Sequence, residues 1–327
     1  MLPLEKQIFK IETEQDFCSV SIQLFEYQYN NNIVYRQYCD LLRKNPSGVH
    51  AMDDIPFLPV SLFKTQRVIS GDFEPQITFF SSGTTQSEPS QHHVKEVALY
   101  EESFLRCFQK FYGDISDYVL LALLPNYMEN PHSSLIYMID RLMELTGSSD
   151  SGYFLHQDES LYRKLAQLKE RGEKTILFGV SYALLDFAER YPIDFPELIL
   201  FETGGMKGRH KELVKEELHA ILKAAFGVSD VHSEYGCCEL LSQAYSAGNN
   251  IFYTPPWMKL LLRDEKDPLT HSSALTSGFI NVIDFANIHS CAFIATDDIG
   301  KKHPDGGIEI LGRMDNAEIR GCNLLII

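Results

Sequence analysis

The chain has 327 residues, of which 44% are hydrophobic and 12% aromatic, and its formal net charge is -16. This composition allows a large buried core, and the acidic balance argues against a nucleic acid or an anionic membrane surface as the main partner. There is no apolar run of about 18 residues and no secretory signal, and the seven cysteines lack a CxxC pair, so we expect a cytoplasmic protein with reduced thiols and no membrane span.

The first predicted element is helical and extends from Thr13 to Asn45. Thr13 and Asp16 have the spacing of a capping box, in which two side chains satisfy backbone N–H groups at a helix start. Apolar residues then recur at helical intervals, from Phe17 to Tyr27. The turn-forming sequence Asn45-Pro46-Ser47-Gly48 ends the helical region.

The segment 77–236 alternates between short apolar runs and amphipathic stretches. Strands that alternate with helices predict an α/β fold, with a mostly parallel sheet flanked by helices. The mixed charges of 211–223 are typical of the solvent-facing side of a helix. The expected strands are Ile77–Phe80, Tyr118–Leu124, Thr175–Phe178 and Leu198–Phe201, and the expected helices are Ser134–Leu145, Leu161–Lys169 and Leu213–Phe226.

The helical period fades after about Leu241, and a β-rich C-terminal subdomain is expected. We therefore predict an α/β body over 1–240, which carries a phosphate-binding loop, and a β-rich subdomain over 241–327 that ends in a short tail. The expected strands of the second part are Trp257–Arg263, Phe279–Asp284, Ala292–Thr296 and Ile308–Leu311.

A loop rich in hydroxyl groups follows the strand predicted at Ile77–Phe80. Its residues Ser81, Ser82, Gly83, Thr84 and Thr85 offer many donors around a flexible glycine, which suits a polyphosphate ligand. The loop lacks the GxxxxGK[ST] pattern of a P-loop, and a polar turn is the alternative interpretation. Neighbouring histidines, His92 and His93, would point apart on a helix or a strand, so we interpret them as loop residues and not as a metal pair.

Five motifs, in order along the chain, resemble those of the adenylate-forming enzymes, the superfamily of acyl-CoA synthetases and luciferases. The serine–threonine loop resembles the phosphate-binding signature of that superfamily, and the glycine pair of 202–205 follows a strand as its adenine-side glycines do. The other three resemble YGxTE, TGDxG and GRxD, and they lie at Tyr235–Glu239, Thr296–Gly300 and Gly312–Asp315.

This resemblance implies a fold and a role for each motif residue. The fold would be the large N-terminal domain of an adenylate-forming enzyme. Ser81 to Thr85 would hold the phosphates of ATP, and Glu239 would offer a hard oxygen to Mg²⁺. Taken singly, each residue also has a structural interpretation. The remaining implied contacts are the adenine for Gly204, Gly205, Tyr235 and Gly236, the ribose for Asp298, and the ribose or phosphate for Arg313.

Two further features resemble the LuxE-like acyl-protein synthetases. The segment Ile55–Lys64 looks like a characteristic sequence of that family, placed upstream of the phosphate loop as it is there. The chain also stops at Ile327, just after the GRxD-like motif, so we expect the small C-terminal domain of acyl-CoA synthetases to be absent. In the family a cysteine near the C-terminus receives the acyl group, and Cys322 matches its context. An idle thiol is the alternative.

The sequence also departs from the superfamily pattern. Gln86 stands where many relatives have glycine, no lysine closes the phosphate motif, and Cys238 replaces a threonine. Another cation must then stabilise the charge that develops on the phosphate. We favour Lys207 for this role, with Lys64 as a second candidate. His132 could orient the carboxylate of the substrate, and a structural histidine is the alternative.

The resemblance thus implies an AMP-forming acid–thiol ligase. The enzyme would use ATP and Mg²⁺ to convert a carboxylic acid, a fatty acid in this family, into an acyl-adenylate. The acyl group would pass to a thiol, which Cys322 could supply, and then to a partner protein such as a reductase. The alternatives are a coenzyme A ligase, a ligase that stops at the adenylate, and a non-catalytic module that binds acyl groups or nucleotides.

Overall fold

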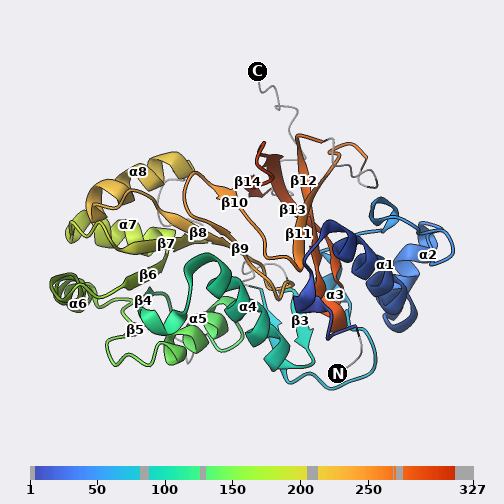
Figure 1. Ribbon diagram of the computed structural model, residues 1–327, viewed down its shortest axis with the longest axis horizontal. Helices are drawn as coiled ribbons and strands as arrows, with labels where there is room; N and C mark the ends of the chain where they lie inside the picture. Colours follow the sequence, from blue (N-terminus) through green and yellow to red (C-terminus); the bar gives the residue numbers. More distant parts are fainter. Residues whose placement is uncertain are drawn as a thin grey trace. The chain divides into compact units, whose positions relative to one another are not determined.

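The computed structural model describes residues 4–81, 88–125, 130–204, 213–267, 269 and 275–313. Its contacts divide the chain into two compact units (Figure 1). The continuous unit is Phe73–Pro255, and the split unit combines Met1–Asp72 with Pro256–Ile327. The contacts therefore group the N-terminal residues with the β-rich C-terminal segment. The boundary expected near residue 240 is a different division, based on the change in sequence pattern.

A mostly parallel sheet forms the centre of the continuous unit. Its strand order is β5-β4-β6-β7-β8-β9, in which only the last pair is antiparallel. Every residue of β4 and β6 is buried, as expected for strands that are covered on both faces. The strands are β4 (Val119–Leu123), β5 (Gly152–Tyr153), β6 (Thr175–Val180), β7 (Ile199–Thr203), β8 (His232–Tyr235) and β9 (Ala244–Ser246), and β10 (Ile251–Phe252) follows them in the chain.

Helices cover both faces of this sheet, which confirms the predicted α/β arrangement. Figure 1 shows α7 and α8 on one side of the sheet and α4 and α5 on the other. Two of the helices end at a glycine in the left-handed region, Gly172 after α6 and Gly227 after α8. The bounds are α4 (Val97–Tyr112), α5 (Ser134–Leu145), α6 (Asp158–Arg171), α7 (Ser181–Arg190) and α8 (Lys215–Phe226).

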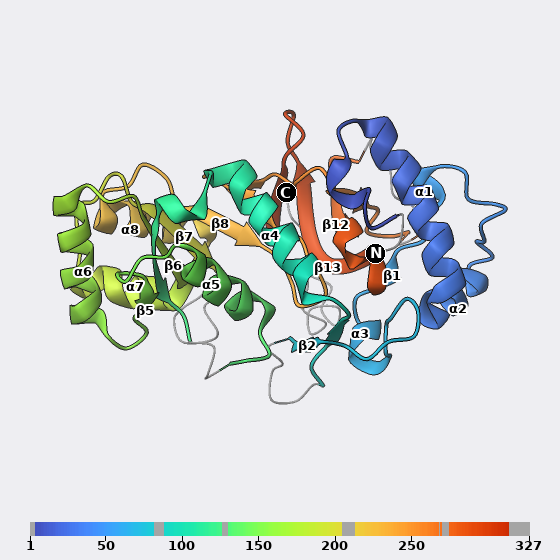
Figure 2. The ribbon, with the colours of Figure 1, turned by 60° about the horizontal axis from the view of Figure 1, so that its bottom comes forward.

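The strand expected at Ile77–Phe80 is present as β2, but it belongs to a different sheet. It pairs antiparallel with β3 (Gln91–Val94) in a separate two-stranded sheet (Figure 2). The interpretation of His92 and His93 as loop residues is therefore wrong. His92 is fully buried on β3, and His93 faces Thr78 of β2, with 3.0 Å between its Nδ1 and the threonine Oγ1.

An antiparallel sheet forms the centre of the split unit, which confirms the β-rich pattern predicted after Leu241. The order is β11-β12-β13-β14, and the short strand β1 (Leu58–Pro59) pairs parallel with β13. The segment around β1 is packed as its apolar sequence suggests, because Ile55, Phe57 and Leu58 are buried. The strands are β11 (Met258–Arg263), β12 (Ser277–Asp284), β13 (Phe293–Lys302) and β14 (Ile308–Arg313).

The predicted N-terminal helix is present as two helices, α1 (Glu14–Asn31) and α2 (Ile33–Leu41). The capping box of Thr13 and Asp16 is confirmed. Asn32 separates the helices, since its side chain accepts a hydrogen bond from Tyr35 N and caps α2. Among the described helices, none is both long and apolar enough to cross a membrane. The remaining helical segments are α3 (Leu62–Thr65) and the short 3₁₀ turns Ile8–Lys10, Met52–Asp54, Ile115–Asp117 and Phe285–His289.

Gln28 connects α1 by hydrogen bonds to the turn between β12 and β13. Its buried amide nitrogen lies 2.9, 3.1 and 3.2 Å from the carbonyl oxygens of Asn287, Ile288 and Ser290. Its amide oxygen accepts a hydrogen bond from Ala292 N at 2.9 Å. One side chain therefore satisfies backbone groups that the turn leaves outside the ladder of the sheet.

The change Gln28→Ala should destabilise the protein, because it leaves these buried backbone groups unsatisfied. We expect the free energy of unfolding to fall by about 3 kcal/mol, measured by chemical denaturation. The exposed Gln23 on the same helix offers a matched control, and Gln23→Ala should change the free energy by less than about 0.5 kcal/mol. Equal effects of the two changes would contradict the role of Gln28.

Candidate active site

The carboxyl ends of β6, β7 and β8 lie next to one another, because these strands are parallel neighbours. Ser181 follows β6 and starts α7, while Gly204 follows β7. Tyr235 is the last residue of β8, and Gly236 follows it. Ligands of open α/β sheets bind at this edge of the strands. The structure therefore brings Gly204, Tyr235 and Gly236 to neighbouring positions at the edge where a ligand is expected.

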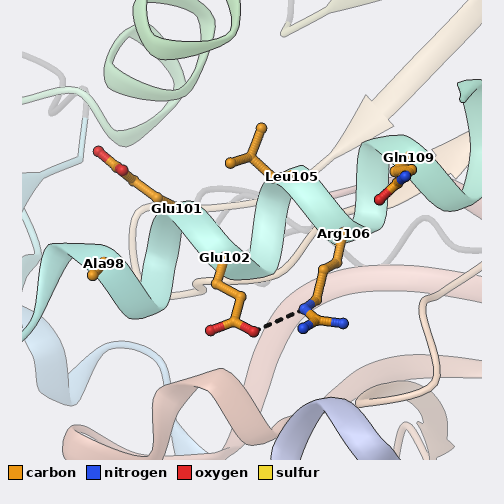
Figure 3. A pocket seen from close by; sticks show the side chains of 6 residues that line it. All are labelled: Ala98, Glu101, Glu102, Leu105, Arg106 and Gln109. Carbon is orange, nitrogen blue, oxygen red and sulfur yellow. Dashed lines mark hydrogen bonds and ion pairs between the residues drawn. The ribbon is translucent and has the colours of Figure 1, made fainter. Parts of the chain in front are cut away.

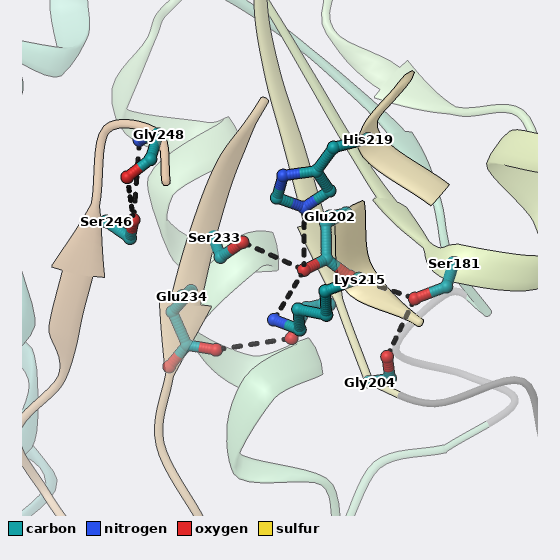
Figure 4. Close-up of polar contacts among 10 residues, drawn as sticks. Ser181, Glu202, Gly204, Lys215, His219, Ser233, Glu234, Ser246 and Gly248 are labelled. Atoms are coloured by element: carbon teal, nitrogen blue, oxygen red, sulfur yellow. Dashed lines mark hydrogen bonds and ion pairs between the residues drawn. The ribbon is translucent and has the colours of Figure 1, made fainter. Parts of the chain in front are cut away.

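A buried carboxylate, Glu202 on β7, is surrounded by polar side chains at this edge (Figure 4). Lys215 Nζ and Ser233 Oγ each lie 2.8 Å from its Oε1, and His219 Nε2 lies 3.6 Å from the same oxygen. Burial alone would raise the pKa of Glu202, but the contacts with His219, Lys215 and Ser233 hold the pKa at about 2. The carboxylate is therefore ionised at neutral pH.

Ser181 connects this cluster to the first residue of the glycine-rich segment, 204–208, which follows β7 in the sequence. Its Oγ lies 2.9 Å from Glu202 Oε2 and 2.7 Å from the carbonyl oxygen of Gly204. Gly204 has a φ of +74°, in the left-handed region that favours glycine. The chain therefore turns sharply at the end of β7, and a serine hydroxyl contacts the turn.

A second carboxyl group, Glu234, lies on β8 directly before Tyr235. Its Oε2 is 3.4 Å from the Oγ1 of Thr203, and burial raises its pKa to about 7. A Cβ on Gly236 would lie 2.6 Å from Glu234 Oε1, so any side chain there would displace the carboxyl group. The backbone at Gly236 therefore closely approaches the carboxyl group, and Glu234 exchanges its proton near neutral pH.

The turn after Tyr235 is held by a buried histidine. The Nδ1 of His92 donates a hydrogen bond of 2.8 Å to the carbonyl oxygen of Cys238, and burial lowers the pKa of His92 to about 4. Burial also raises the pKa of the Cys238 thiol, so this side chain is an uncharged part of the core. Glu239, the next residue, is buried with 4% of its surface exposed.

Ser81 and His132 lie together near the phosphate loop. Ser81 Oγ accepts a hydrogen bond of 2.9 Å from Ser90 N, and Ser81 N donates one of 3.1 Å to Ser90 O, so the two ends of the loop are joined. The carbonyl of His132 accepts from Phe80 N at 2.9 Å, and its ring packs against the Phe80 ring at 5.1 Å. His132 is thus near the loop start, with an exposed side chain.

In the split unit, the structure brings the fourth and fifth motifs together. Asp298 on β13 lies opposite Arg313 on β14 in the antiparallel register. Arg313 Nε is 3.6 Å from Asp298 Oδ1, and 16% of the aspartate side chain is exposed against 54% of the arginine side chain. The pair offers two acceptor oxygens and a forked donor at one place, as a ribose hydroxyl or a phosphate would require.

Several predicted site residues lie outside the described residues. They are Ser82, Gly83, Thr84, Thr85, Gly205, Lys207 and Cys322. The second candidate cation, Lys64, is an exposed residue of α3 in the split unit.

Sequence reasoning missed the cluster around Glu202. The charged stretch 211–223 contributes two members of this cluster that its pattern does not reveal: Lys215, whose side chain is 38% exposed, contacts the buried carboxylate, and His219 is buried. A usable signal was Glu202 itself, an acidic residue that directly follows the apolar run Leu198–Phe201. An acid at the end of a fully buried strand needs a partner.

A hollow lies along one side of α4 (Figure 3). The ion pair of Glu102 and Arg106, four residues apart with 2.8 Å between oxygen and nitrogen, crosses this side of the helix. All of its lining residues come from this one helix, and they are Ala98, Glu101, Glu102, Leu105, Arg106 and Gln109. This spacing is that of one amphipathic face, so we assign the hollow no catalytic role.

Solved structures of adenylate-forming ligases share this fold. A 2-hydroxyisobutyryl-CoA ligase in complex with an acyl-adenylate matches with a TM-score of 0.66 and 11% identity, over 95% of this chain and 70% of the ligase. ATP-bound MatB from Rhodopseudomonas palustris matches with a TM-score of 0.55 and 16% identity, over 74% of this chain. The match spans about half of MatB, 49% of its chain. The fold is therefore that of the adenylate-forming ligases, as predicted.

Sequence comparison identifies the family within this class. Two long-chain-fatty-acid–luciferin-component ligases are similar to the chain. The one from Vibrio harveyi is 25% identical over 92% of this chain and 84% of the relative, and the one from Aliivibrio fischeri is 22% identical over 92% and 85%. The family model described as "Acyl-protein synthetase, LuxE" matches residues 9–327. The chain belongs to this family of acyl-protein synthetases and is a ligase.

The raised pKa of Glu234 predicts a pH-dependent stability. Its pKa is about 7 in the folded protein against an ordinary value of 4.5. Proton binding by Glu234 therefore contributes fully to the free energy of unfolding below pH 4.5, and this contribution is lost as the pH rises through 7. The change Glu234→Gln should therefore stabilise the protein at pH 8 by roughly 2 kcal/mol, with a gain that shrinks toward pH 5.

Chemical denaturation at several pH values between 5 and 8 measures this difference. Glu170→Gln, at an exposed position of α6, serves as the control and should change the stability little at either end of the range. A stability gain for Glu234→Gln that is the same at pH 5 and pH 8 would contradict the raised pKa.

Proposed function

We propose that the chain activates a long-chain fatty acid as its acyl-adenylate and transfers the acyl group to a thiol. The observation that carries the proposal is the placement of the glycine turn after β7 and the Tyr235-Gly236 turn after β8 on neighbouring parallel strands. The family description and the names of the two luciferin-component ligases support the same reaction and an acyl substrate.

The first step joins the acid to the nucleotide. A carboxylate oxygen of the acid attacks the α-phosphorus of ATP, the bond from this phosphorus to the bridging oxygen breaks, and pyrophosphate leaves. We assign the phosphates to Ser81 and its loop, the adenine to Tyr235 with the glycine turn, and the ribose to Asp298 with Arg313. The carboxylate of Glu239 would offer a hard oxygen ligand to Mg²⁺, and the ion would supply positive charge to the phosphates.

The second step moves the acyl group to sulfur. A thiolate attacks the carbonyl carbon of the acyl-adenylate, the bond from this carbon to the AMP oxygen breaks, and AMP leaves. We propose Cys322 as the thiol, Lys207 as the cation near the phosphate, and His132 as a group that orients the acid. The acyl group would then pass to a partner protein such as a reductase. We expect the reaction to take place in the cytoplasm, since none of the six cysteines in the described part of the chain forms a disulfide.

The adenylation step predicts an exchange of pyrophosphate into ATP. We expect exchange that depends on long-chain acids, and the Cys322→Ser variant should retain it while losing covalent labelling by a radiolabelled fatty acid. Cys18→Ser, on α1, is the matched control and should retain both exchange and labelling.

The outcomes separate the alternatives. Covalent labelling that survives Cys322→Ser would exclude this residue as the acceptor, and labelling of added coenzyme A instead would indicate a coenzyme A ligase. ATP binding without exchange for any acid would indicate a non-catalytic module.

Asp298 should determine the recognition of the ribose. Because a hydrogen bond to a charged acceptor contributes about 1.5 to 3 kcal/mol, Asp298→Ala should raise the KM for ATP at least about tenfold. The wild-type protein should prefer ATP over 2′-deoxy-ATP, and the variant should lose this preference. If the variant keeps the full preference for ATP, Asp298 does not bind the ribose.

A further inference from the structure

The cluster around Glu202 has a feature that charge compensation does not require. Lys215 and Ser233 each contact Oε1 at 2.8 Å, so the charge of the carboxylate is already compensated at this oxygen. Ser181, in contrast, reaches the other carboxylate oxygen and the backbone of a different turn. The cluster therefore connects a fixed charge inside the sheet to the first residue of the glycine-rich segment.

The geometry around Ser181 is restrictive. Its side chain is buried, with 2% of the residue exposed, and it starts α7, so its Oγ has little freedom to move. Gly204 is exposed and has no Cβ that would restrict its backbone. A glycine at the end of a strand is otherwise free to adopt many conformations, and the contact with Ser181 Oγ at 2.7 Å selects one of them.

We propose that Ser181 and Glu202 are positioning residues for nucleotide binding: the Ser181 hydroxyl shares its single proton between Oε2 of Glu202 and the carbonyl oxygen of Gly204, and so holds the Gly204 carbonyl in place next to the buried carboxylate. This inference rests on the proposed function, in which the turn at Gly204 contacts the adenine. Ser181 and Glu202 do not touch the nucleotide in this arrangement. They hold the turn in its binding conformation before the nucleotide arrives, which lowers the entropic cost of binding.

The test compares two serines that make the same kind of contact in the same unit. Ser246 is also buried, and its Oγ donates to the carbonyl of Gly248 at 2.8 Å, on β9 (Figure 4). Ser181→Ala and Ser246→Ala should lower the melting temperature by similar amounts. Only Ser181→Ala should raise the KM for ATP, about tenfold, with a kcat in pyrophosphate exchange within about threefold of the wild-type value.

A double-mutant comparison tests whether Glu202 acts through Ser181. Glu202→Gln should raise the KM for ATP by itself, and in a protein that already carries Ser181→Ala it should add less than about twofold. Independent, multiplicative effects would show that Glu202 acts by another route. A KM for ATP that Ser181→Ala leaves unchanged, or that both serine variants raise equally, would overturn the proposal.

The proposal remains testable if the proposed reaction fails. In a wild-type protein without exchange activity, the rise in melting temperature caused by ATP replaces the KM as the measure of binding. Ser181→Ala should then reduce this rise and Ser246→Ala should not. An equal rise in the three proteins would refute the positioning role, and the absence of any rise in the wild-type protein would refute nucleotide binding and the proposal together.

Discussion

The ionised carboxylate of Glu202 constrains the ends of three elements in the continuous unit. An ion that is removed from water is stable only when opposite charge and hydrogen-bond donors surround it. These donors come from α7, β8 and α8, so the carboxylate is satisfied only when the ends of these elements have converged. The edge of the sheet where the candidate site lies is thus held together by a charge, in addition to apolar packing.

In the split unit, the pairing of strands positions the candidate site residues. Asp298 and Arg313 face one another because β13 and β14 pair in one register, and a shift by one residue would turn a side chain to the opposite face. Their own ion pair is partly exposed, with 3.6 Å between the charged atoms, and such pairs contribute little to stability. The arrangement of this pair therefore follows from the sheet and does not create it.

The sequence predicted the elements whose pattern is local. Ser134–Leu145 and Ile77–Phe80 have the predicted bounds, because the first repeats its apolar residues at helical spacing and the second is a short apolar run between polar residues. The motif resemblance then supplied the fold and the family. Partners distant in the sequence were not accessible in this way. No local pattern shows that β2 pairs with β3, or that Lys215 of a charged helix meets the carboxylate of Glu202.

The same physical argument bears on the lysine missing from the phosphate loop. Lys215 is near the glycine turn and could be taken for the replacement, but its ammonium group lies 2.8 Å from the buried Glu202 carboxylate. A cation that moved to a phosphate would leave that carboxylate buried without its main opposite charge, at a cost of several kcal/mol. Lys215 is therefore committed to the sheet, and the transferring phosphate requires a cation without a buried acidic partner. Lys64 satisfies this condition as an exposed residue of α3, and Lys207 remains the candidate next to the glycine pair.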